Sequence, residues 1–69
     1  MKISYKPLMR QLLERDIGKM DLLRAANLST TTLSKLGKNE PVKLEMLMKI
    51  CKALHCRIED VVEFVEDGK

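Results

Sequence analysis

Short hydroxyl side chains and a lysine recur in one stretch near the middle of the chain: Thr30, Thr31, Ser34 and Lys35, with Lys38 just beyond. Hydroxyls can donate to or accept from base edges, Thr methyls can touch the thymine methyl, and lysines can reach guanine or phosphate. At helical spacing these positions share an outward face, because Leu33 and Leu36 face the core. A face of small polar and basic side chains fits the major groove of double-stranded DNA.

Direct base readout from this face is expected to be modest. Residues 30–36 contain no Arg, Gln or Asn, which supply most bidentate base contacts. Affinity is therefore expected to come mainly from phosphates, with part of the specificity coming from DNA shape.

The other residues suited to chemistry are two thiols and the single imidazole of the chain. Cys51, His55 and Cys56 offer three metal ligands crowded into one short segment, whereas structural zinc normally takes four ligands in separated pairs. We expect the cysteines to be core residues and His55 to end a helix, where the helix dipole favours a cation. There is no phosphate-cradling Gly loop. The sequence predicts no catalytic residue, no metal site, no cofactor and no enzymatic activity.

Residues 19–38 supply the elements that must hold the polar face outward. A helix is expected over 19–26, ending at Asn27, which tolerates the left-handed conformation of a C-cap. Ser29 is a strong N-cap candidate for a second helix over 30–36. Apolar side chains are expected to clamp the two helices: Leu22, Ala26, Leu28, Leu33 and Leu36. This arrangement is a helix-turn-helix.

The rest of the chain is expected to add three helices, giving five in one all-α domain over residues 1–69. The first follows Pro7, which suits a first helical turn. The fourth spans about 44–54, and the fifth begins near Ile58. The apolar stripes are Leu8, Leu12 and Leu13 in the first helix, and Leu44, Leu47, Ile50, Cys51 and Leu54 in the fourth. Alternation in residues 3–5 and 63–65 suggests that the chain ends pair as short strands.

Charge is distributed unevenly along the chain. Residues 1–57 carry 12 Lys or Arg against 5 Asp or Glu, a net +7, whereas the acidic end, residues 58–69, carries a net −4. A basic body with an acidic end is suited to binding a polyanion on its basic side. Aromatic residues are limited to Tyr5 and Phe64, which argues against a platform for single-stranded nucleic acid.

No run approaches the ~18 apolar residues of a membrane span, and the start does not resemble a signal peptide. A cytoplasmic protein with reduced thiols, and no association with a membrane, is therefore expected.

Two stretches, MDLLRAANLSTTTLSKLGKNE and VKLEMLMKICKALHCRIEDVVEF, resemble the Cro and phage-repressor (XRE-type) family of helix-turn-helix domains. The resemblance runs from Tyr5 to Phe64 and is closest to small stand-alone members of bacteria and their mobile elements. It implies a compact lambda-repressor-like fold of five helices whose third helix enters the major groove. The chain departs from the family at Leu23, where Ala is usual, and at Asn27, where Gly is usual.

Carried over by position, the resemblance makes Thr30, Thr31, Ser34 and Lys35 candidate groove contacts and Lys19, Lys38 and Lys43 candidate phosphate contacts. Lys19 and Lys43 also stand at expected helix starts, where a cation opposes the dipole by a few tenths to ~1 kcal/mol. A phosphate bound there would turn this unfavourable interaction into a favourable one, because the free amides and the lysine both attract the phosphate. Asn39, in the following loop, is expected to add a contact.

A single domain offers too little surface for a tight specific site, so a homodimer on a near-palindromic operator is expected. Its reading helices should lie roughly 34 Å apart. Phe64 and Val65 are the expected dimer surface, because they are apolar and distant from the basic face. Val61 and Val62 are expected to close the core.

The function implied is sequence-specific DNA binding by a transcriptional regulator, with repression expected. The alternative is an antitoxin or another partner-binding regulator on the same fold. Methionines could then form an adaptable partner surface, although filling of the core is commoner: Met9, Met20, Met46 and Met48.

Overall fold

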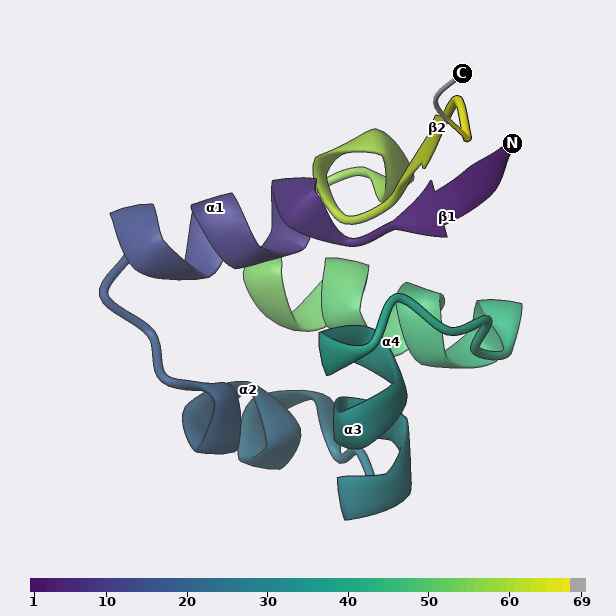
Figure 1. Cartoon of the computed structure of the whole chain (residues 1–69). Helices are drawn as coiled ribbons and strands as arrows, with labels where there is room; N and C mark the ends of the chain where they lie inside the picture. Colours follow the sequence, from purple (N-terminus) through teal and green to yellow (C-terminus); the bar gives the residue numbers. More distant parts are fainter. Residues whose placement is uncertain (68–69) are drawn as a thin grey trace.

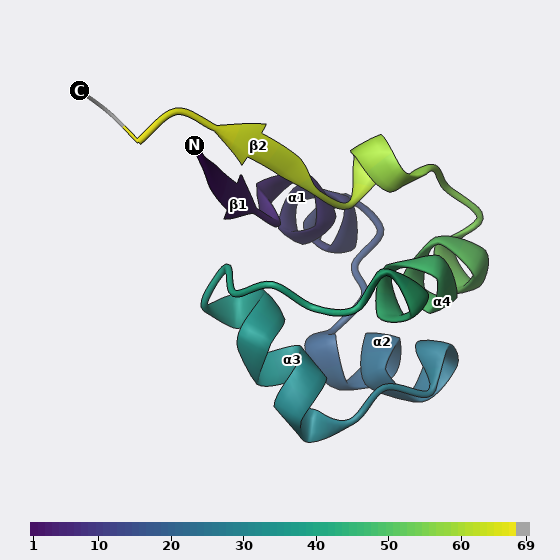
Figure 2. The ribbon, with the colours of Figure 1, turned by 90° about the vertical axis from the view of Figure 1, so that its right-hand side faces the viewer.

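The computed structural model describes residues 1–67, which form four α-helices, one 3₁₀ turn and a two-stranded antiparallel sheet. Helix α4 lies between α1 on one side and the pair α2 and α3 on the other (Figures 1 and 2). None of the helices in residues 1–67 has the length and apolar character needed to cross a bilayer. In chain order the elements are β1 (Lys2–Ser4), α1 (Lys6–Glu14), α2 (Lys19–Ala26), α3 (Thr30–Gly37), α4 (Leu44–Leu54), η1 (Ile58–Asp60) and β2 (Glu63–Val65).

The helix ends are set largely by the residues that the sequence singles out. Pro7 lies in the first turn of α1. Asn27 ends α2 in the left-handed conformation, at φ 56° and ψ 50°, as predicted. Ser29 caps α3, its hydroxyl accepting a 3.2 Å hydrogen bond from the amide of Thr32. The start of α2 is held by a hydrogen bond that was not predicted from the sequence: the Asp21 carboxylate accepts from the Gly18 amide at 3.2 Å.

The core is aliphatic apart from one tyrosine. Leu28 in the turn before α3 is buried, as predicted. Two leucines assigned to apolar stripes are exposed instead: Leu13 at 82% and Leu44 at 71%. Each lies at a helix end, where no neighbouring element covers it. The buried residues are Tyr5, Leu8, Leu12, Leu22, Ala26, Leu28, Leu36, Leu47, Ile50, Leu54 and Val61.

The predicted fifth helix is wrong. Its place is taken by the single turn η1, in which the Asp60 carboxylate accepts from the Arg57 amide at 3.2 Å. The carbonyl of Val61 then accepts from the Leu8 amide of α1 at 3.2 Å. A continuing helix would direct that carbonyl along its own axis. Because it bonds to the open N-terminal turn of α1 instead, the helix stops and the chain becomes extended.

The chain ends pair as strands, as the alternation suggested. β1 and β2 are antiparallel, with Ile3 opposite Phe64 and Lys2 opposite Val65. Met1 reinforces the pairing, because its ammonium lies 2.8 Å from the Asp67 carboxylate. The domain is therefore mostly helical rather than all-α. Residues 68–69 of the predicted acidic end lie outside the described residues.

Candidate nucleic-acid interface

Helix α3 lies at the end of the molecule opposite η1 and β2 (Figures 1 and 2). Its Leu36 is buried at 1% exposure against the core, while Leu33 is only half-buried. This anchoring turns the opposite side of the helix outward. All four predicted groove residues are exposed: Thr30, Thr31, Ser34 and Lys35.

The cap of α3 separates the threonines into two roles. The Thr32 hydroxyl lies 3.1 Å from the Ser29 hydroxyl, and Thr32 is half-buried. Thr32 thus strengthens the helix start, whereas Thr30 and Thr31 keep their hydroxyls on the exposed face. The first turn of α3 is fixed before any ligand binds, which lowers the ordering cost of an interface built on it.

The loop after α3 is tied to the start of α1 by contacts that sequence reasoning missed. The side-chain oxygen of Asn39 accepts from the Tyr5 amide at 3.0 Å, and the Tyr5 hydroxyl donates to the Glu40 carbonyl at 2.7 Å. Asn39 adopts a left-handed backbone, with φ 58°. Burial raises the pKa of Tyr5 above 10.0. Asn39 therefore holds the loop in place through its side-chain oxygen.

The three predicted phosphate lysines all stand at helix ends. Lys19 is the first residue of α2, Lys43 is the N-cap of α4 and Lys38 is the C-cap of α3, and all three are exposed. Lys43 and Lys35 line one surface hollow between α3 and α4. The positive ends of the α2 and α4 dipoles thus coincide with lysines, a combination that attracts phosphate.

A fourth cation joins this region without having been singled out in the sequence. Lys6, the first residue of α1, lines a hollow together with Lys19 and Asn39. Nothing in a single sequence places Lys6 beside Lys19, because the two belong to separate helices. The loop contacts of Tyr5 bring the start of α1 to this side of the molecule.

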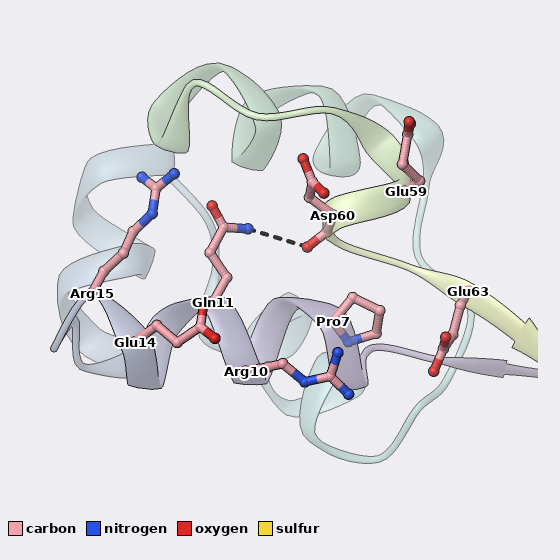
Figure 3. A pocket seen from close by; sticks show the side chains of 8 residues that line it. All are labelled: Pro7, Arg10, Gln11, Glu14, Arg15, Glu59, Asp60 and Glu63. Atoms are coloured by element: carbon pink, nitrogen blue, oxygen red, sulfur yellow. Dashed lines mark hydrogen bonds between the residues drawn. The ribbon is translucent and has the colours of Figure 1, made fainter.

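Four carboxylates, together with two arginines, line a groove between α1 and the η1–β2 segment (Figure 3). Gln11 bridges this groove, its side-chain amide donating to the Asp60 carbonyl at 3.1 Å. Glu59, Asp60 and Glu63 line it with Arg10 and other residues of α1. The η1 carboxylates thus lie away from α3 (Figure 1), whereas Glu63 of β2 also lines a hollow with Lys38 and Asn39, just beyond the end of α3.

The two residues predicted to form a dimer surface lie on β2. Phe64 is 71% exposed, and Val65 is half-buried. Val61 is fully buried and Val62 packs partly against the core, as predicted. A largely exposed phenyl ring on a short strand leaves apolar surface uncovered in the isolated chain.

Comparison with known proteins gives two positive results. A family model described as the Cro/C1-type HTH DNA-binding domain matches residues 2–67. The fold is also similar to a solved structure, the crystal structure of transcriptional regulator VanUg, Form II, with a TM-score of 0.86 and 42% sequence identity. That similarity covers 90% of this chain and 83% of the other. No curated protein sequence gives a significant match.

Proposed function

The chain belongs to the Cro/C1-type family of helix-turn-helix DNA-binding domains, and we propose that it is a sequence-specific transcriptional repressor. In this proposal α3 enters the major groove of double-stranded DNA. The observation that carries it is the outward polar face of α3, fixed by the buried Leu36 and the Ser29 cap. Thr30, Thr31, Ser34 and Lys35 then contact base edges and the groove wall.

The lysines at the helix ends position the protein on the DNA backbone. Lys19 and Lys43 contact phosphates together with the free amides at the starts of α2 and α4. Lys38 and the side-chain nitrogen of Asn39 extend these contacts past the end of α3. Phosphate contacts carry no sequence information directly, but they set the orientation from which α3 reads the groove.

The repressor acts as a homodimer on a near-palindromic operator. Phe64 and Val65 form the dimer surface, supported by the 71% exposure of the Phe64 ring. Two reading helices related by a two-fold axis would then meet half-sites about one DNA turn apart, roughly 34 Å.

The proposed role is regulatory and requires no catalytic residue, metal or cofactor. Control then comes from protein concentration or from a partner. A cytoplasmic location, in contact with the DNA that it regulates, is part of this proposal.

A partner-binding role, such as that of an antitoxin, is the second candidate. It is favoured by exposed apolar side chains one turn apart on α4, Leu44 at 71% and Met48 at 69%. Met20 on α2 is also exposed, at 51%, whereas Met9 and Met46 pack against the core. Only part of the predicted methionine surface is therefore available to a partner.

Selection of bound duplexes from a random pool tests the proposal. A near-palindromic consensus with half-sites about 10–10.5 base pairs apart is expected. The variant Ser34→Glu places a carboxylate on the α3 face and should abolish enrichment. Leu13→Glu, which adds the same charge at an 82% exposed site at the end of α1, should preserve it. Absence of enrichment with the folded wild-type protein, or equal enrichment with Ser34→Glu, would refute the major-groove assignment.

A further inference from the structure

Helix α4 ends in a backbone motif that brings Cys51, in its last turn, close to Cys56, just beyond its end. His55 adopts the left-handed conformation, at φ 54° and ψ 50°, and the Cys56 amide donates to the Cys51 carbonyl at 3.0 Å. This six-to-one hydrogen bond is the outer bond of a Schellman-type cap, and the His55 amide donates to the same Cys51 carbonyl. The residues joined by that bond usually pack apolar side chains against each other. In this chain both positions hold cysteine.

The surroundings hold the two thiols in place and leave them accessible. Both cysteines are free and half-buried. The Gln11 amide donates to the Cys56 sulfur at 3.6 Å and to the Asp60 carbonyl at 3.1 Å, so one side chain of α1 fixes both Cys56 and η1. Burial raises the pKa of the Cys51 thiol, and the adjacent Cys56 thiol and the carboxylates of Asp60 and Glu59 raise it further.

From this geometry we propose that Cys51 and Cys56 are a dithiol modification site that forms an intramolecular disulfide by exchange with a small-molecule disulfide, such as oxidised glutathione. One cysteine thiolate attacks a glutathione sulfur and releases one glutathione thiolate, giving a mixed disulfide. The second thiolate attacks the protein sulfur of that mixed disulfide and releases the second glutathione. The protein loses two electrons and two protons, and one glutathione disulfide becomes two thiols.

The cap favours closure over other thiol reactions because the second thiol is already adjacent when the mixed disulfide forms. An intramolecular partner held in position has a high effective concentration, so the mixed disulfide resolves before a second protein molecule collides. The bond joins the last turn of α4 to the segment that leads into η1. Its formation depends on the fold of one chain and does not require the proposed DNA-binding role.

Mass spectrometry of the full chain in glutathione redox buffers tests the proposal. The expected product is a monomer that has lost two hydrogen atoms. Trypsin cleaves after Lys49, Lys52 and Arg57, so the bond would link peptide 50–52 to peptide 53–57. The matched variants Cys51→Ser and Cys56→Ser should stop at a single glutathione adduct. Accumulation of glutathione adducts or disulfide-linked dimers in the wild type, without the linked peptides, would overturn the proposal.

A second measurement separates the effect of the fold from that of proximity along the chain. The equilibrium constant for forming the Cys51–Cys56 disulfide is measured in buffers of known ratio of reduced to oxidised glutathione. It should be at least about tenfold higher in the native protein than in concentrated urea, because the cap holds the two thiols together. An equal or smaller native constant would mean that the cap does not favour the bond, and the proposal would fail.

Discussion

Replacing Lys43 with alanine should weaken the salt dependence of DNA binding by an amount set by the number of phosphates lost. Each phosphate neutralised contributes about −0.9 to the slope of log binding constant against log salt. With Lys19, Lys38 and Lys43 each contacting one phosphate, a dimer makes about six such contacts and gives a slope of about −5.4. Lys43→Ala removes about two of them and should give a slope of about −3.6.

Fluorescence anisotropy of a labelled operator, measured between about 50 and 200 mM salt, can resolve this difference. The wild-type affinity should fall about 10³-fold over that range and the variant affinity about 10²-fold. Lys52→Ala is the matched control, because Lys52 is an exposed lysine in the last turn of α4, at the opposite end from Lys43. An unchanged slope for Lys43→Ala, or an equal reduction for Lys52→Ala, would refute the assignment of phosphate contacts to the start of α4.

Three further predictions concern the framework that holds α3. Ser29→Ala removes the hydroxyl that accepts from the Thr32 amide and should lower the free energy of unfolding by about 1 kcal/mol in urea titrations; no change would mean that the cap is dispensable. Asn27→Ala removes the side-chain amide that lets Asn tolerate a left-handed backbone and should cost up to about 1–2 kcal/mol, whereas Asn27→Gly should be tolerated; equal costs would contradict this. Because burial raises the pKa of Tyr5, the stabilisation from its neutral hydroxyl is present below pH 10.0 and is lost as pH rises through the folded-state pKa. Ultraviolet titration of this single tyrosine should give a pKa above 10.0, and a value at or below 10.0 would contradict the burial.

Local signals in the sequence predicted the helix-turn-helix well. The ends of α2, the cap by Ser29 and the bounds of α4 follow from residues adjacent in the chain, and such signals do not depend on the rest of the fold. Asn27 serves in place of the usual glycine because its side chain tolerates the left-handed region.

Features that depend on distant parts of the chain were predicted less well. A fifth helix was expected from the apolar pattern after Ile58, yet the bond from the Leu8 amide to the Val61 carbonyl ends the turn. That bond joins residues far apart in sequence. Leu44 is exposed despite its place in the α4 stripe, because periodicity identifies a face but not where its covering partner ends.

The candidate site was likewise predicted in part. The exposure of Thr30, Thr31, Ser34 and Lys35 follows from helical period and the position of the core. The hydrogen bond that Asn39 accepts from the Tyr5 amide could not be predicted in this way, because Tyr5 lies far from Asn39 in the sequence. The nearness of Lys6 to Lys19 is hidden for the same reason.

The most direct test of the central claim is an NMR titration of ¹⁵N-labelled protein with the selected duplex, followed at each backbone amide. The largest shift changes should fall in the first turn of α3 and at the starts of α2 and α4, with residues 58–60 of η1 little affected. Changes concentrated in η1 with α3 unperturbed would contradict the placement of α3 in the groove.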